Sequence, residues 1–300
     1  MNLKILITCI DFINYTGSEI YIFELSKELK KLGNEVTIVS NIGNPLMSEA
    51  KKFNLRLVNL SDIDSIKHEN FDILHLNHSH ISKIVLNKFP STPAVMTIHS
   101  EILDLERPLI TSRIKKYIAI RPKIKSFLME RFSIPEELIS LIYNPFDFNR
   151  FNKKPLNEEK RKKRIIFIGT LEHLRKNSIL DLVSFTKENY ELWICGKKHL
   201  NYIDDILIKN PHVKYFNVTS NPEKLIQQCD ETAGILLGRT TIEGWLCGKS
   251  GWIYDIDKDG NIKSKELLPP PEDLYKFDSK IVSKEIEKLY TEIINKFNPK

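Results

Sequence analysis

Short apolar runs alternate with longer segments of helical periodicity from the first residues of the chain onward. Residues 3–10 form an apolar run of strand length, and a polar loop follows. Across residues 19–32 apolar side chains recur at helical spacing, with Ser18 as the expected N-cap and Gly33 as the expected C-terminal cap. Residues 35–40 are rich in β-branched side chains, which favour a strand. The opening therefore predicts strand, loop, helix and strand.

The same alternation continues to about residue 143. Strands that alternate with helices form a parallel sheet with helices on both faces. The first half of the chain is therefore expected to be one α/β domain of the Rossmann-like class. Its further strands are expected at residues 55–59, 73–76, 95–98, 117–120 and 139–143.

A second series of the same kind follows, which predicts a second Rossmann-like domain. The last helix is long and amphipathic, and the proline-rich residues 267–277 before it are expected to be extended. The expected strands are residues 164–169, 191–195, 213–218, 234–237 and 252–255, and the expected helices are residues 177–187, 222–229, 240–247 and 279–296.

These patterns divide the chain into residues 1–150, residues 151–278 and a C-terminal helix at 279–300 that packs back on the first domain. The segment from Lys153 to Arg164 carries seven basic residues and two acidic ones. We interpret it as a solvated linker, with contact to a membrane surface as the alternative hypothesis. Two open α/β sheets place their ligand sites at the carboxyl ends of their strands, so a shared cleft is expected.

Composition narrows the class of protein. Hydrophobic residues make up 41% and charged residues 28%, which excludes a disordered or fibrous chain. The net charge of +6 suits an anionic small molecule but is too weak to indicate nucleic acid. The four cysteines are scattered and form no C-x-x-C pair. With no expected signal peptide or membrane span, a reduced cytoplasmic protein, in contact with a membrane only at its periphery if at all, is the expectation.

Candidate chemistry is clearest at residues 238–249. Gly238 follows an expected strand and precedes an expected helix, so the backbone can approach a ligand there. The free N–H groups of a helix N-terminus attract an anion. Glu243 lies about one turn into this helix, where its carboxylate can accept hydrogen bonds from two ribose hydroxyls.

Six short motifs, in a shared order along the chain, resemble those of the family-4 glycosyltransferases, which have the GT-B fold. The first is Thr16-Gly17-Ser18-Glu19, similar to a Gly-Gly-x-Glu loop, and the last is Glu243 with Gly248 and Lys249. Between them lie the stretch from Leu29 to Val39, Thr97-Ile98-His99, Tyr143-Asn144-Pro145-Phe146-Asp147, and Gly169-Thr170-Leu171 followed by Arg175-Lys176-Asn177.

The resemblance implies two Rossmann-like domains facing a cleft, and transfer of a sugar from a nucleotide-diphosphate donor to a hydroxyl acceptor. The acceptor would be a glycan, a lipid-linked group or a small molecule. Family members retain the sugar's configuration, and neither a metal nor another cofactor is expected. Carried over to this sequence, Glu243 holds the ribose and Lys176 pairs with the diphosphate. Gly17 lines the loop facing the diphosphate, Gly238 and Arg239 belong to the donor site, and His99 lies near the transferred sugar as the catalytic candidate.

The sequence departs from the family pattern at three positions. Thr170 stands where the family has an arginine, and Arg239 is a candidate replacement for it. Ile235 stands where an acid precedes Glu243 by eight residues, and Thr16 replaces a loop glycine. An inactive GT-B protein that binds a nucleotide sugar or a glycan partner is therefore the alternative function. A nucleotide-sugar epimerase is a third, and would need acid and base carboxylates in the cleft.

The same residues also have purely structural interpretations. Glu243 could be an exposed helix carboxylate, Lys176 a solvated lysine, His99 a hydrogen-bonded histidine at a strand end, and Gly17 and Gly238 turn glycines.

Three other patterns suggest metals but fit their context poorly. Residues 255–266 match the calcium loop of an EF-hand, yet a strand precedes them, so a hairpin with Asp259-Gly260 at its turn is preferred. Asp62-Ile63-Asp64 mimics the D-x-D of metal-dependent transferases but is expected at a helix start. A zinc site is disfavoured because no cysteine or carboxylate matches the four histidines near two strand ends: His75, His78, His80 and His99.

Overall fold

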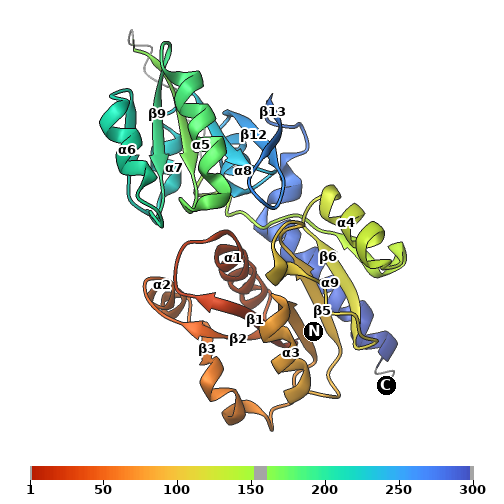
Figure 1. Ribbon diagram of the computed structural model, residues 1–300. Helices are drawn as coiled ribbons and strands as arrows, with labels where there is room; N and C mark the ends of the chain where they lie inside the picture. Colours follow the sequence, from red (N-terminus) through yellow and green to blue (C-terminus); the bar gives the residue numbers. More distant parts are fainter. Residues whose placement is uncertain (1, 152–160, 298–300) are drawn as a thin grey trace. The chain divides into compact units, whose positions relative to one another are not determined.

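The computed structural model describes residues 2–151 and 161–297, so residues 153–160 of the expected linker, and the membrane hypothesis with them, lie outside the described residues. The chain divides into two compact units, Met1–Phe146 with Tyr275–Lys300 (unit 1) and Asp147–Leu274 (unit 2). In Figure 1, unit 1 is drawn in red to yellow together with the blue terminal helix, and unit 2 in green to light blue.

Unit 1 is built on a parallel sheet in the order β3-β2-β1-β4-β5-β6-β7. Because all of these strands run in one direction, their carboxyl ends meet at one edge, where ligand sites of open α/β sheets form. The described strands are β1 (Lys4–Phe12), β2 (Glu35–Ile42), β3 (Arg56–Asn59), β4 (Ile73–Asn77), β5 (Ala94–Ile98), β6 (Ile114–Ala119) and β7 (Ile139–Leu141).

The hydrophobic core of unit 1 combines side chains of its sheet with those of its helices. The C-terminal helix α9 (Ser279–Phe297) packs against α1 (Gly17–Lys31) and contributes side chains such as Ile286 and Tyr290 to the same core. The other helices are α2 (Leu46–Lys52), α3 (Ser79–Lys88) and α4 (Pro122–Phe132), with 3-10 turns at Leu60–Ile66, Asp104–Glu106, Glu136–Leu138 and Leu274–Phe277.

Unit 2 has a second sheet in the order β10-β9-β8-β11-β12-β13, parallel except for the antiparallel pair β12–β13. Its strands are β8 (Lys163–Ile168), β9 (Tyr190–Cys195), β10 (Val213–Phe216), β11 (Glu231–Ile235), β12 (Ser250–Ile256) and β13 (Ile262–Leu268). Its helices are α5 (His173–Thr186), α6 (Tyr202–Lys209), α7 (Pro222–Ile226) and α8 (Arg239–Leu246). The α/β class and the two Rossmann-like sheets predicted from the sequence are confirmed.

Four local predictions are wrong. Thr16, not Ser18, is the N-cap of α1, because the Glu19 carboxylate holds the backbone at Thr16. Helix α5 begins at His173 rather than at 177, and β11 occupies 231–235 rather than 234–237. Residues 267–277 are not extended throughout, since β13 runs to Leu268 and a 3-10 turn occupies Leu274–Phe277.

Candidate functional site

Helix α8 places a buried carboxylate at the carboxyl end of the unit 2 sheet. Glu243 is only 6% exposed, and its Oε1 lies 3.3 Å from Nε of Arg239, one turn earlier on the same helix. Burial raises the pKa of Glu243, although the nearby charges of Arg239 and Arg150 act in the opposite direction. Glu243 is therefore not an exposed helix carboxylate, and removing it from water without a full set of partners costs free energy.

The start of α8 is fixed against two strand ends. Gly238 is its N-cap residue, and its N–H donates to the carbonyl of Leu236 (2.9 Å). The Thr240 hydroxyl donates to the carbonyl of Ile168 (2.9 Å), which ties the helix to the end of β8. A Cβ at Gly238 would lie 3.2 Å from the carbonyl oxygen of Ile235, so this glycine permits a close backbone approach.

The start of α5 brings two cations to the same edge. Lys176 is partly exposed, with Nζ 5.8 Å from the ring centroid of Tyr202. Arg175 pairs with Glu172, and its Nε lies 3.1 Å from where a Cβ would stand on Gly169. Burial lowers the pKa of Arg175.

Arg175 was missed as a site residue in the sequence. It lies in the first turn of α5, whose side chains lean back over the end of β8. There its Nε lies against Gly169, the residue before Thr170, where the family has its arginine, so Arg175 is a candidate replacement in addition to Arg239. Had α5 been predicted to begin at His173 instead of at residue 177, Arg175 would have been placed in its first turn, at the edge of the sheet.

Two glycines allow β8 and β9 to end in close contact. A Cβ on Gly196, whose φ is +156°, would lie 1.8 Å from the carbonyl oxygen of Gly169. Next to Gly196, a hollow of about 530 Å³ is lined by Lys197, Lys198 and Tyr215, and by Asn217 and Val218, which follow β10. Nζ of Lys198 lies 4.3 Å from the ring centroid of Tyr215. The edge of unit 2 thus offers cations and an aromatic ring at the ends of β9 and β10, in the same sheet whose strand β11 leads into the helix of Glu243.

In unit 1, the loop after β1 is organised by one carboxylate. Oε1 of Glu19 accepts the N–H groups of Ile13 (3.0 Å) and Asn14 (3.1 Å). Its Oε2 accepts the N–H (3.0 Å) and the hydroxyl (2.7 Å) of Thr16. Gly17 therefore begins α1 at an exposed position at the carboxyl edge of the sheet.

His99 follows β5 at that edge and is partly exposed. Its backbone N–H donates to Oε2 of Glu106 (2.9 Å), and its Nε2 lies 2.9 Å from Oδ1 of Asn77. The ring packs edge-on against Tyr21 of α1, with centroids 4.8 Å apart. Desolvation lowers the pKa of His99 to about 4, so the ring is neutral near pH 7. Gly17 and His99, the two candidate residues of unit 1, thus lie at the same edge of its sheet.

The neighbouring histidines are engaged in other contacts. His75 is fully buried, bonded to the Tyr290 hydroxyl and to Thr97 Oγ1 (2.7 Å), and burial lowers its pKa to about 3. His78 accepts the N–H of Ile10 at Nδ1 (3.2 Å). Across residues 2–151 and 161–297 no group of three or more His, Cys, Asp or Glu is arranged to hold a metal.

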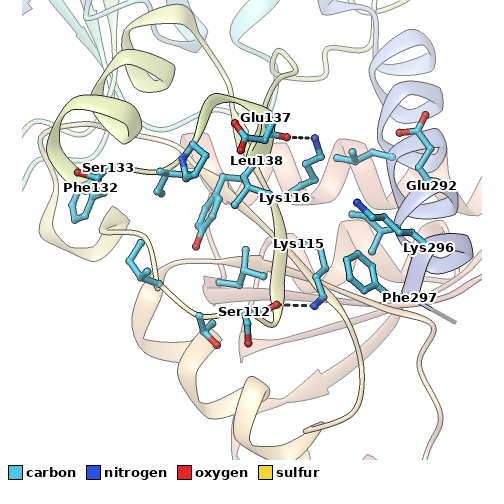
Figure 2. Close-up of a pocket in the computed structure, with 18 residues that line it drawn as sticks. Ser112, Lys115, Lys116, Phe132, Ser133, Glu137, Leu138, Glu292, Lys296 and Phe297 are labelled. Atoms are coloured by element: carbon cyan, nitrogen blue, oxygen red, sulfur yellow. Dashed lines mark hydrogen bonds between the residues drawn. The ribbon is translucent and has the colours of Figure 1, made fainter.

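A larger cavity of about 670 Å³ lies elsewhere in unit 1 (Figure 2). Its walls come from the first residues of β6, the connection before β7 and the last turns of α9. Lys115 on its rim donates to the carbonyl of Ser112 (2.7 Å). Because the strands are parallel, the start of β6 lies at the sheet edge opposite to His99, and this cavity is separate from the candidate site.

The predicted hairpin at residues 255–266 is confirmed by the antiparallel pairing of β12 and β13. Gly260 has a φ of +81°, as a turn glycine requires. Asp257 accepts N–H groups from Asp259 (2.9 Å) and Asn261 (2.9 Å), and the Asn261 side chain binds its other oxygen (3.0 Å). Asp62, by contrast, lies in the expected helical turn, here a 3-10 turn.

Millimolar calcium is expected to leave the melting temperature unchanged, because the Asp257 carboxylate is already used inside the hairpin. Thermal melts with calcium and with a chelator check this. A saturable rise with calcium that Asp257→Ala abolishes would reinstate the calcium loop.

The first half of the chain matches a known protein family. Residues 15–150 match the model of Glycosyltransferase Family 4. No curated protein matches the chain. None of the described helices combines the length and apolar character needed to cross a membrane.

Several solved structures resemble the chain over nearly its whole length. HepE of Anabaena in complex with UDP-glucose is 14% identical, with a TM-score of 0.77, covering 97% of this chain and 100% of that one. A glycosyltransferase from Rickettsia africae is 18% identical, with a TM-score of 0.72 and coverage of 98% and 99%. AviGT4, involved in avilamycin A biosynthesis, is 12% identical, with a TM-score of 0.69 and coverage of 97% and 98%. The GT-B fold and the resemblance to family-4 glycosyltransferases are thereby confirmed.

Proposed function

We propose that the protein is a glycosyltransferase that moves a sugar from a nucleotide-diphosphate donor to a hydroxyl acceptor. The observation that carries this proposal is the carboxyl edge of the unit 2 sheet, where α8, after β11, carries the buried Glu243 carboxylate and the first turn of α5, after β8, carries the cations Arg175 and Lys176. A carboxylate that accepts two hydroxyls suits a ribose, and cations beside helix N-termini suit a diphosphate.

The comparisons support the same donor class. HepE is solved with UDP-glucose, and again with UDP and glucose. Its fold covers 97% of this chain, so we use UDP as the first nucleotide to test. Retention of configuration and independence of metal belong to the proposal as well. They rest on the family resemblance, and on Arg175, Lys176 and the N-terminus of α8 to neutralise the departing diphosphate.

Each candidate residue has a proposed role. Glu243 holds the ribose, Gly238 lets the backbone approach the donor, and Arg239 pairs with Glu243 beside the diphosphate. In unit 1, Gly17 faces the diphosphate and His99 contacts the transferred sugar.

The decisive experiment is a panel of nucleotide sugars scored for thermal stabilisation and for slow hydrolysis. Stabilisation with hydrolysis of one donor supports the proposal. Stabilisation without turnover of any donor, with or without acceptors, would favour the inactive binding protein, which Ile235 motivates because it ends β11 where the family has an acid. No stabilisation by any donor would reject both.

Arg175→Met is expected to weaken UDP binding about tenfold or more, since a charge-assisted hydrogen bond contributes roughly 1.5–3 kcal/mol. UMP binding should change little, because the second phosphate is where the cations converge. Lys176→Ala should act in the same direction. Calorimetry with both nucleotides measures the difference.

Lys187→Ala is the matched control, because this exposed lysine lies at the opposite end of α5. It should leave both dissociation constants unchanged. If Arg175→Met alters neither nucleotide while Arg239→Ala alters UDP, Arg239 is the replacement for the missing family arginine.

A further inference from the structure

One side chain beside His99 is oriented by its own hydrogen bonds. Asn77, the last residue of β4, is fully buried. Its Nδ2 donates to the backbone carbonyl of Thr8 (3.0 Å). A carbonyl oxygen can only accept, so the amide nitrogen must face Thr8 and the amide oxygen must face the other way.

That orientation determines the proton on His99. The Asn77 Oδ1 lies 2.9 Å from Nε2 of His99 and can only accept, so Nε2 must carry the hydrogen. A neutral ring then has its lone pair on Nδ1. Among residues 2–151 and 161–297 no hydrogen bond to Nδ1 is found, and the His99 side chain is partly exposed, so Nδ1 is the ring nitrogen left to accept from a ligand.

The rest of the cluster keeps this geometry rigid. The Asn77 N–H donates to Oγ1 of Thr8 (2.8 Å), which joins β4 to β1. Glu106 is 2% exposed and accepts the backbone N–H of His99 on one oxygen, and its other oxygen lies 3.3 Å from Nε2 of His78. The ring, its backbone and its amide partner are thus each held by a separate contact.

From this geometry we infer that Asn77 is a positioning residue, which fixes His99 as a hydrogen-bond acceptor at Nδ1 for a substrate hydroxyl. The inference deepens the proposed function and rests on it for the identity of the hydroxyl, which belongs to the donor sugar or the acceptor. It excludes His99 as a cationic partner of a phosphate near neutral pH, and the low pKa of His99 agrees with this.

The test is the long-range ¹H–¹⁵N spectrum of the histidine rings in the ligand-free protein, with the His99 signals identified by their absence in His99→Gln. Wild type should show the proton on Nε2, with a detectable, slowly exchanging resonance. Asn77→Ala should lose that resonance and give averaged nitrogen shifts. A proton on Nδ1 in wild type, or an Asn77→Ala spectrum identical to wild type, would overturn the inference.

Thr8→Val is the control for a merely structural effect. It removes the Oγ1 contact with the backbone of Asn77 but keeps the Thr8 carbonyl that orients the amide. It should lower the melting temperature yet keep the Nε2 resonance, and loss of that resonance in Thr8→Val would count against a specific role of Asn77.

A second readout uses any donor that wild type hydrolyses. Asn77→Ala should lower its kcat while UDP affinity stays at the wild-type value, because neither Asn77 nor His99 is among the groups proposed to hold UDP. An unchanged kcat would overturn the role in substrate binding. The spectra need no nucleotide, so failure of the donor panel with the expected spectra would reject the proposed function alone.

Discussion

Gly196→Ala should destabilise unit 2 by about 3 kcal/mol or more and lower its melting temperature. The added Cβ would lie 1.8 Å from the backbone carbonyl oxygen of Gly169, and the φ of +156° is one that residues with a side chain rarely adopt. Neither obstacle can be relieved by rotating a side chain. Relief requires β8 and β9 to separate at their carboxyl ends, where the nucleotide is proposed to bind, so UDP binding should fall as well.

Gly234→Ala is the matched control for this substitution. Gly234 lies in β11 of the same sheet, and its added Cβ would meet Thr240 and Thr241 at 3.7 Å, an ordinary contact. Its effect should stay within about 0.5 kcal/mol. Thermal melts of the three proteins measure the difference, and a Gly196→Ala protein that melts with wild type would show that the strand ends are loosely packed.

Glu243→Gln should stabilise the ligand-free protein and weaken the nucleotide complex. Burial raises the pKa of Glu243, so the folded state favours the protonated carboxyl. The cost in stability therefore grows as pH rises from the unfolded pKa of about 4.3 to the higher folded pKa and is constant above it, while both states are protonated below the unfolded pKa. The neutral glutamine escapes this cost, so its advantage should be largest near pH 8 and should shrink toward pH 4.

Binding should change in the opposite direction. Loss of a charge-assisted contact to the ribose should weaken UDP by roughly 1.5–3 kcal/mol, or about 10- to 150-fold. Melts across pH and calorimetry with UDP measure the two effects on the same protein. An unchanged dissociation constant in a stabilised, folded Glu243→Gln protein would remove Glu243 from the ribose site.

Glu223→Gln serves as the control, because Glu223 is also a buried carboxylate of unit 2 and pairs with Arg150 (3.0 Å). Its replacement breaks that pair, so it should lower stability while UDP affinity stays at the wild-type value.

The order of strands and helices along the chain was predictable because most strands are short apolar runs, and most helices repeat apolar side chains at helical spacing. The predicted starts of strands and helices were wrong where the first residues of the element are polar. Strand β11 begins at Glu231 and Thr232, and Thr232 is fully buried despite its hydroxyl. Helix α6 was missed altogether, although α8, of the same length, was predicted.

The candidate site was predictable only where a short motif carries it. Glu243 and His99 belong to such motifs, and their roles stay predictions. Arg175 escaped because the start of α5 was misplaced, which assigned it to a loop. Asn77 escaped because its role depends on β1 and β4 being neighbours in the sheet, which local periodicity does not reveal.

The chain order of unit 1 bears on how the protein folds as it is synthesised. Unit 2 is continuous in sequence and can fold once residue 274 has left the ribosome. Unit 1 has to wait for α9, because α9 covers α1 and its Tyr290 supplies the hydroxyl that bonds His75. Until α9 has been synthesised, the face of α1 that it covers stays exposed, and His75 lacks its hydrogen bond to Tyr290. The nascent chain therefore has all the residues of its second-made unit before it has all those of its first-made one.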